Sequence, residues 1–299
     1  MLNFPIPRAV VIVGALILAV CFSVVAQDNL TVQEILDRHL RSFGSADAIG
    51  KSQKRMAVGR SDFTPFDTGK SGTGQAKFAS DGKDMAFFSI FDLWNYSAEK
   101  IGIFSNKATI PKVDNGRSPL GSFLFAYDQT LTGRLFGGSI FSTWLFLGSD
   151  LNGMTAEAGG KKKVNGADAW MIKVVPKGGL TAGSYIKLYF DAKEFHHIRT
   201  VYFQKGIDQG FFDVGSPSNS PMTTSTSGLR GEPTYNDTTL TEDFSDYRSD
   251  ACGIALPHKY DLHLEADTPT SRGSAQFVWH FQISGYTLTS DPPSKLFSF

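Results

Sequence analysis

Hydrophobic and polar residues alternate along most of the chain after about residue 54, in short runs separated by Gly, Asp, Asn and Ser. This period of two is typical of antiparallel strands joined by turns. The pattern predicts strands over residues 55–62, 74–80, 84–91, 94–104, 107–111, 163–175, 184–191, 195–204, 240–248, 259–265 and 275–285. The chain is therefore expected to be mainly β, with about eleven strands.

The alternation gives each strand one apolar face and one polar face. Phe277, Trp279 and Phe281 alternate with polar residues, and Trp170 and Leu262 lie in strands of the same kind. An antiparallel sheet of this type has one face in the core and one in water. Many such strands are expected to curve into a half-open barrel, with helices closing the open side.

A helix is expected near the start of the mature chain. Thr31 and Glu34 have the spacing of a capping box, in which each side chain accepts a hydrogen bond from the other residue's main-chain N–H. Apolar residues follow at helical spacing as far as Phe43, and Gly44 is expected to end the helix in a left-handed conformation. A second short helical turn is expected from Ser45.

Residues 123–147 break the β pattern, because they are densely apolar and aromatic with only Asp128 and Arg134 charged. The spacing of the apolar residues predicts helix, with a hinge at Gly137 and Gly138. The stretch falls short of the roughly 18 uninterrupted apolar residues needed to span a bilayer. It is therefore expected to be a helical insert that either completes the core or forms a lid over an apolar cavity.

The N-terminus has the pattern of a secretory signal peptide over residues 1–26. Arg8 is its only charge, an apolar run covers residues 9–20, and small residues precede Gln27. Two alternatives stay open: a lipoprotein processing site ending at Cys21, and an N-terminal anchor that is not cleaved. The compartment expected from the signal is the periplasm.

The mature chain, residues 27–299, is expected to form a single domain. Residues 121–148 are its helical apolar insert. Residues 206–237 are rich in Ser, Thr, Pro and Gly and carry no lasting period, which predicts a long flexible loop.

Charge and motifs exclude several function classes. Basic and acidic residues number 29 each, so a nucleic-acid partner is not expected. The six histidines fit no metal-binding or nucleophile motif, and His196 and His197 are expected on opposite faces of a strand. We therefore predict no catalytic residues, no metal site, no cofactor and no enzymatic activity.

Several segments resemble one known family. Residues 184–204, SYIKLYFDAKEFHHIRTVYFQ, are similar to the paired strands of bacterial outer-membrane lipoprotein-sorting proteins of the LolA/LolB type. Residues 34–44, 135–144 and 246–258 resemble segments that large LolA-like relatives carry in the same order. The resemblance implies a half-open barrel around an apolar cavity, helices that act as a lid, and transport of lipoprotein acyl chains or related lipids across the periplasm. The insert and the loop at 206–237 are longer than in the compact carriers.

The expected function is thus that of a periplasmic carrier or binder of lipid or lipoprotein acyl chains. The alternative is a sensor or scaffold module that uses the same fold to bind a partner protein, and proteins of either membrane or the membrane surface are further candidate partners. Candidate lipid-binding residues share apolar character and a place on the insert or on the apolar face of a strand: Phe136, Phe141, Trp144, Leu147, Trp170, Ile172, Leu188, Phe190, Leu262, Phe277, Trp279 and Phe281.

Overall fold

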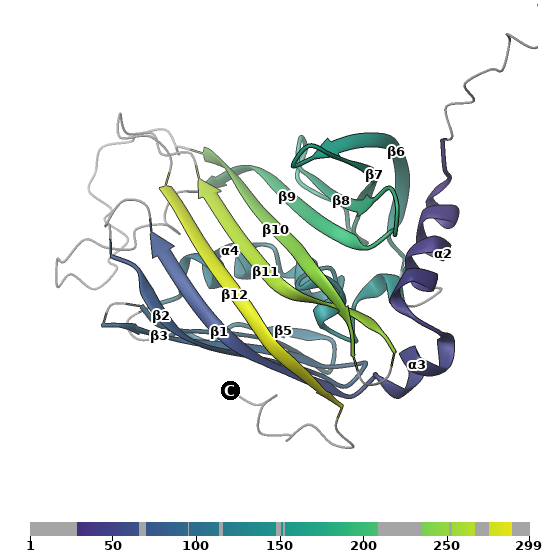
Figure 1. Ribbon diagram of the computed structural model, residues 1–299. Helices are drawn as coiled ribbons and strands as arrows, with labels where there is room; N and C mark the ends of the chain where they lie inside the picture. The colour runs from purple at the N-terminus through teal and green to yellow at the C-terminus, as the bar shows by residue number, and fades with distance from the viewer. Residues whose placement is uncertain are drawn as a thin grey trace, which may run out of the picture.

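A curved antiparallel sheet of twelve strands forms the body of the protein, in the order β5-β4-β3-β2-β1-β12-β11-β10-β9-β8-β7-β6 (Figure 1). The computed structural model describes residues 29–65, 70–94, 96–113, 116–147, 151, 153–208, 235–250, 253–266 and 275–288. Neighbours in the sheet are neighbours in sequence except where β1 pairs with β12. Because β5 and β6 are edges and do not pair, the sheet is an open half-barrel, as predicted.

The strands have the following bounds: β1 Arg55–Pro65, β2 Gly72–Ser80, β3 Met85–Leu93, β4 Tyr96–Phe104, β5 Lys107–Thr109, β6 Thr155–Val164, β7 Ala167–Val175, β8 Tyr185–Asp191, β9 His197–Asp208, β10 Tyr235–Ser249, β11 Ala255–Ala266 and β12 Ala275–Leu288. Their alternation follows the prediction. On β12, Phe277, Trp279 and Phe281 are buried while His280 and Gln282 are exposed. The buried side chains lie on the concave face of the sheet.

The prediction of one strand over residues 163–175 is wrong, because two strands, β6 and β7, meet there in a hairpin. Asn165 and Gly166 both have positive φ, 49° and 84°, as a tight two-residue hairpin turn requires. The pairing also shifts register between Ala158 and Lys161, around two glycines. The sequence of β6 has no apolar alternation, which explains why it was missed and why the strand count is twelve.

Two helices precede the sheet. Helix α2 (Val32–Phe43) begins with the predicted capping box between Thr31 and Glu34, and α3 (Ala46–Lys51) is capped by the Ser45 hydroxyl. Gly44 follows α2 at φ 153° and ψ −174°, so it is not in the left-handed helical conformation that we expected. A Cβ there would lie 3.1 Å from the carbonyl oxygen of Gly253, so the close approach itself favours glycine.

The insert is helical only in its first part. Helices α4 (Pro119–Ala126) and α5 (Asp128–Thr132) are followed by two single 3₁₀ turns, η1 (Gly138–Ile140) and η2 (Leu145–Leu147). The predicted helix after residue 140 is thus wrong. Gly137 and Gly138 have φ of 75° and 48°, which break a right-handed helix.

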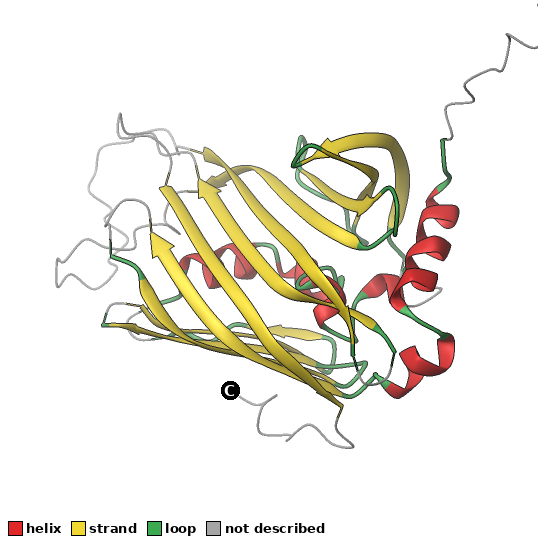
Figure 2. Cartoon of the chain, viewed as in Figure 1, coloured by secondary structure: helices red, strands yellow, loops and turns green. Residues whose placement is uncertain are grey.

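The insert lies on the concave side of the sheet, and it appears behind β11 and β12 in Figure 1 and in red behind the yellow strands of Figure 2. Helices α2 and α3 stand at the end of the sheet where β1 begins. The insert and the buried face of the sheet form one apolar core. The insert therefore fills the hollow of the half-barrel.

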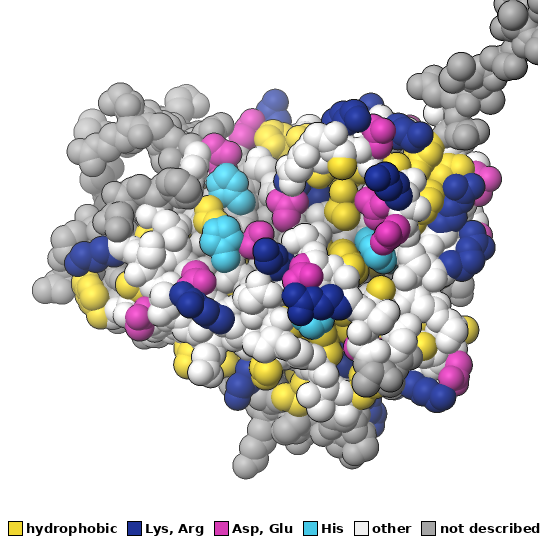
Figure 3. Space-filling view, viewed as in Figure 1, with side chains coloured by type: hydrophobic (Ala, Val, Ile, Leu, Met, Phe, Trp, Pro, Cys, Tyr) yellow, Lys and Arg dark blue, Asp and Glu magenta, His cyan; other side chains and the backbone are white. Residues whose placement is uncertain are grey.

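Two predicted segments fall partly or wholly outside the described residues. The proposed signal peptide, with Cys21, lies outside them. Strand β9 runs to Asp208 and β10 begins at Tyr235, so the ends of the stretch predicted as loop are strands, and its remainder lies outside the described residues. Within the described residues, no helix has the length and apolar character needed to cross a membrane. The face toward the viewer in Figure 3 carries basic, acidic and histidine side chains interspersed with apolar ones.

Candidate functional site

The concave face of the sheet is lined by large aromatic and aliphatic side chains. The rings of Phe78 and Phe87 stack with their centroids 5.1 Å apart, and Phe281 meets Phe87 edge-on at 5.4 Å. Tyr260 stacks on Phe281 at 5.5 Å. A surface of this kind binds through burial of apolar area, which is favourable for many apolar groups of different shape.

The insert covers this surface with side chains of the same kind. Every residue from 135 to 146 is buried. The ring of Phe141 lies 5.9 Å from that of Phe78, and the ring of Phe136 lies 6.4 Å from that of Phe87. The insert makes these contacts from irregular backbone and two 3₁₀ turns, not from a strand of the sheet. It could therefore move away without breaking a ladder of strand hydrogen bonds.

Arg55, at the start of β1, holds the main chain of the insert. Its guanidinium donates to the carbonyl oxygens of Ser139, at 2.7 Å, and Ile140, at 3.0 Å. The side chain is buried, and this burial lowers the pKa of Arg55 to about 10. The ring of Phe43 lies 5.6 Å from the guanidinium carbon. A buried cation is thus stabilised by carbonyls of the insert, and loss of those carbonyls would leave it poorly solvated.

Glu242, from β10, is a second anchor. Its carboxylate accepts hydrogen bonds from the N–H of Gly137 at 2.8 Å and from the hydroxyls of Tyr202 at 2.6 Å and Tyr260 at 2.5 Å. The carboxylate is fully buried, and burial raises its pKa to about 7. The hydrogen bond to Gly137 lies at the glycine pair where the insert turns.

Ser142 provides the third anchor, at the ends of β2 and β3. Its N–H donates to the Ser80 hydroxyl at 2.8 Å, and its own hydroxyl donates to the carbonyl of Gln53 at 2.6 Å. The N–H of Gly82 donates to the Ser142 hydroxyl at 2.9 Å. These bonds join the insert to the turn between the two strands.

The first helix of the insert is fixed by a separate polar group. The carboxylate of Glu99 accepts from the hydroxyls of Tyr96 and Ser118, the latter at 2.6 Å, and Ser118 also caps α4. The indole N–H of Trp279 donates to the Tyr96 hydroxyl at 2.8 Å. Burial raises the pKa of Glu99 to about 7. The start of α4 is therefore tied to β4 and β12.

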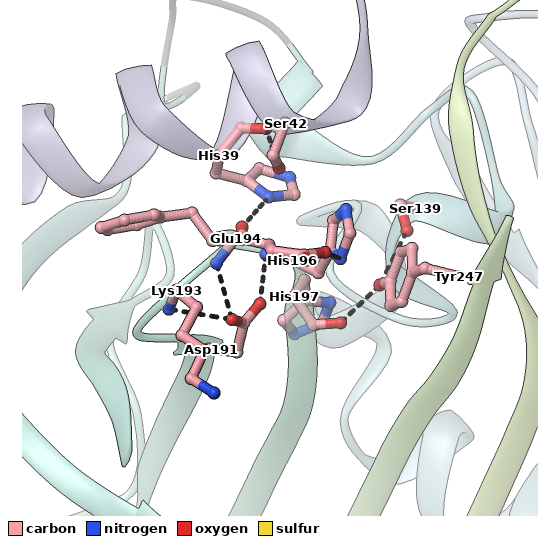
Figure 4. Close-up of polar contacts among 10 residues, drawn as sticks. His39, Ser42, Ser139, Asp191, Lys193, Glu194, His196, His197 and Tyr247 are labelled. Carbon is pink, nitrogen blue, oxygen red and sulfur yellow. Dashed lines mark hydrogen bonds and ion pairs between the residues drawn. The ribbon is translucent and has the colours of Figure 1, made fainter. Parts of the chain in front are cut away.

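Two buried histidines hold Trp144 of the insert between them. The Trp144 ring is stacked on His197 at 4.6 Å and meets His39 of α2 edge-on at 4.9 Å. His39 Nδ1 lies 2.8 Å from the carbonyl oxygen of Phe195 (Figure 4). His197 Nε2 lies 3.1 Å from the carbonyl oxygen of Arg199, whereas His39 Nε2, Trp144 Nε1 and His197 Nδ1 are buried without a hydrogen-bond partner.

The same two histidines are neutral because they are buried. Burial lowers the pKa of His39 to about 4, and burial together with the nearby His39 lowers the pKa of His197 well below its usual value. A proton on either ring would be a buried charge without a carboxylate in hydrogen-bonding contact in the described structure. Acid therefore opposes this packing of Trp144.

The turn between β8 and β9 leads into His196, which is partly buried, and His197, which is fully buried at the start of β9. The Asp191 carboxylate accepts from the N–H groups of Lys193, Glu194 and His196 and so orders the turn (Figure 4). The ring of His196 stacks on that of Tyr247 with their centroids 4.3 Å apart. The Tyr247 hydroxyl donates to the His197 carbonyl and lies 3.4 Å from the Ser139 hydroxyl of the insert.

The structure brings the twelve candidate residues from the sequence into one apolar cluster. All are buried except Leu147, which is partly buried and packs against the cluster. They come from the insert and from four strands: Phe136, Phe141, Trp144 and Leu147 from the insert, Trp170 and Ile172 from β7, Leu188 and Phe190 from β8, Leu262 from β11, and Phe277, Trp279 and Phe281 from β12. Their binding of lipid stays a prediction.

The polar anchors were not found from the sequence. Glu242 stands between Leu240 and Phe244 on the apolar face of its strand, and this interruption was a usable signal. Arg55 begins a strand and gave no comparable signal. Within the described residues, no group of three or more His, Cys, Asp or Glu side chains is arranged to hold a metal ion.

Comparison of the sequence with known proteins finds no family profile and no curated protein that matches the chain. Comparison of the structure does find solved structures. The chain is similar to a LolA superfamily protein from Nitrosomonas europaea, with 10% identity and a TM-score of 0.44 over 90% of this chain and 98% of that one. It is also similar to a DUF1329 family protein from Desulfovibrio piger, with 11% identity and a TM-score of 0.44 over 89% of this chain and 97% of that one.

A third similar structure is a putative outer membrane lipoprotein-sorting protein domain from Vibrio parahaemolyticus, with 10% identity and a TM-score of 0.42 over 88% of this chain and 97% of that one.

Proposed function

We propose that the protein is a periplasmic carrier or binder of lipid or lipoprotein acyl chains, which lie on the concave apolar face of the sheet beneath the insert. The observation that carries this proposal is the way the insert is held. An entirely buried apolar segment rests on an apolar sheet, yet its main chain is joined to the sheet mainly through the side chains of Arg55, Glu242 and Ser80.

An acyl chain can replace the contact that the insert makes with the sheet. Moving the insert exposes apolar area on the sheet and on the insert itself, and a chain that takes its place removes the area on the sheet from water again. Each methylene of the chain contributes about 0.8 kcal/mol when it is buried. The bound chain is thus protected from water without covalent chemistry.

Native mass spectrometry tests the proposal. The protein is purified without detergent from cells that make it, and acyl lipid is expected to be bound to a fraction of the molecules. A spectrum with only the mass of the chain, before and after incubation with phospholipid vesicles, contradicts the proposal.

The alternative, a module that binds a partner protein, is favoured by one feature. Strand β6 is an edge of the sheet and carries Lys161, Lys162 and Lys163. Edge strands can pair with a strand of another protein, and the lysines would favour an acidic one. This alternative is supported if an envelope protein binds through β6 and that binding is lost when the three lysines are changed to Glu. The protein should then also carry no bound lipid.

A further inference from the structure

A polar pair interrupts the apolar surface at one end of the concave face. Gln204 of β9 and Thr238 of β10 lie directly opposite each other in the strand register. Both occupy inward positions in the alternation of their strands, as do Tyr202 on β9 and Leu240 on β10. Gln204 is 0% exposed and Thr238 is 1% exposed. The pair is therefore inside the protein and not on its polar surface.

Every side-chain polar atom of this pair is without a hydrogen bond. Gln204 Nε2, Gln204 Oε1 and Thr238 Oγ1 are buried and have no partner. Buried polar groups are normally paired, because an unpaired one has given up its hydrogen bonds to water without a replacement. Glu242, only four residues after Thr238, accepts hydrogen bonds from two tyrosine hydroxyls and a main-chain N–H. The unpaired atoms at Gln204 and Thr238 are thus a local exception.

The surroundings of the pair fit one end of an amphipathic ligand. Leu240 and Leu264 are opposite each other one inward step along the sheet, and Ala266 is opposite Thr238 on β11. All three are buried. Gln204 lies near the end of β9, which runs to Asp208, and Thr238 lies near the start of β10, which begins at Tyr235. A ligand with an apolar chain along the sheet would place a polar group at its end against the pair.

The chemistry of the pair selects the polar group. A carboxamide presents an acceptor and a donor side by side. A trans secondary amide that lies between the two side chains can pair with both, because its N–H can donate to Gln204 Oε1 while its carbonyl, on the opposite side, accepts from the Thr238 hydroxyl. An ester or a carboxylate has no N–H and would leave Gln204 Oε1 unpaired.

We infer that Gln204 and Thr238 bind the amide group of an N-acylated ligand whose acyl chain lies on the concave face. This inference rests on the proposed function and adds the class of ligand. The shared chemistry is an amide-linked acyl chain, and it could come from the N-acylated terminus of a lipoprotein or from an amide-containing lipid.

Binding of matched probes to the full mature chain tests the inference. N-methyldodecanamide and methyl dodecanoate differ only in the N–H and ester oxygen, and each competes with a fluorescent fatty-acid probe. The amide is expected to bind about tenfold more tightly than the ester. An N-dodecanoyl tripeptide added as a third probe distinguishes the sources: tighter binding than the simple amide assigns the lipoprotein terminus, and weaker binding assigns an amide lipid.

A double variant, Gln204→Met with Thr238→Val, provides the matched test. It removes the unpaired atoms with little change of volume, so thermal unfolding should show that it is at least as stable as the wild type. The preference for amide should disappear while the ester still binds. Thr239→Val, on the outward side of the same strand, should keep the preference.

The possible failures are distinct. Equal affinity of the wild type for amide and ester, or an amide preference that persists in the double variant, overturns this inference and leaves the proposed function intact. Failure of the wild type to bind either probe contradicts the proposed function as well.

Discussion

The carboxylate of Glu242 accepts a hydrogen bond from the N–H of Gly137 at 2.8 Å, although the two residues lie 105 positions apart in the chain. The contact joins the centre of the sheet to the glycine pair at which the insert changes direction. Because Glu242 is buried, its ionisation and the position of the insert depend on each other.

The stability contributed by Glu242 should decrease as pH rises. Burial raises its pKa from 4.5 to about 7 in the folded protein, so the folded state holds the proton more tightly than the unfolded state. The contribution is complete below pH 4.5 and is lost as pH rises through 7. Compared with wild type, Glu242→Gln should gain about 1–3 kcal/mol of unfolding free energy between pH 5 and pH 8, measured by urea denaturation.

Glu157→Gln, at an exposed position on β6, is the control for that experiment and should follow the wild type at each pH. Glu99 is also buried, with its pKa raised to about 7, and will add a similar slope to both wild type and Glu242→Gln. A constant difference between wild type and Glu242→Gln across this range contradicts the assignment.

Acid should loosen the insert through His39. Its pKa is lowered from 6.5 to about 4 by burial, so below pH 6.5 the unfolded or opened state takes up a proton that the folded state does not. The stability of the packed state therefore falls as pH decreases from 6.5 toward 4, by up to about 3 kcal/mol. His197, His196 and Asp191 are the other titratable groups acting on His39, and Asp191 opposes the effect.

Hydrogen exchange at the amides of residues 137–141 measures this loosening. After correction for the intrinsic effect of pH, protection should be lower at pH 5 than at pH 7.5 in the wild type. In His39→Gln the protection of these amides should depend less on pH. Equal dependence in the two proteins would show that His39 does not hold the insert.

Arg55→Met should free the insert more than it harms the sheet. The substitution removes the hydrogen bonds to the carbonyls of Ser139 and Ile140 and keeps an apolar stem in the same space. We expect acyl probes to bind and leave severalfold faster, with a loss of stability of about 1–3 kcal/mol. Stopped-flow fluorescence gives both rates.

Arg60→Met is the matched control on the same strand, because the Arg60 ion pair with Asp62 is exposed and contributes little. Unchanged exchange rates in Arg55→Met, with the stability loss present, would place Arg55 in an ordinary structural role.

Trp144→Ala tests whether the insert is a movable cover or a fixed part of the core. A buried tryptophan in a rigid core costs about 3–5 kcal/mol when it is truncated. If the insert can leave the sheet, Trp144→Ala should cost less than Phe190→Ala, whose side chain is fully buried on β8, and should accelerate probe release more. Denaturant midpoints and release rates for the two variants are the measurements. A larger stability loss for Trp144→Ala, without faster release, contradicts the account.

Elements with one buried face and one exposed face could be predicted from the sequence, because their apolar residues recur at a regular spacing. Trp279 and its neighbours alternate because β12 has one face in the core and one in water, so the strand and its buried face were both predictable. Strand β6 was missed because its glycines and lysines carry no such alternation. The half of the insert after Gly138 was assigned to helix wrongly, since burial on every side gives an apolar run that no period can resolve.

The polar anchors show a different limit of the sequence. Glu242 could be recognised as a charge on an apolar face, but its partner Gly137 is distant in the chain, and only the fold brings the two together. Arg55 is likewise defined by the carbonyls that it meets. The candidate apolar residues were correctly grouped because the burial of a side chain depends on its residue type and on its place in the alternation along the strand. The anchors, in contrast, are defined by contacts that only the tertiary structure creates.

The most direct test of acyl-chain binding under the insert uses quenching of tryptophan fluorescence by brominated acyl chains. One variant keeps only Trp279, which is fully buried on the concave face, and another keeps only Trp94, which is 83% exposed. The account predicts saturable quenching of Trp279 by bound brominated chains, faster in onset when Arg55→Met is added, with Trp94 unaffected. Quenching of Trp94 alone, or of neither residue while the protein remains folded, would contradict binding on the concave face.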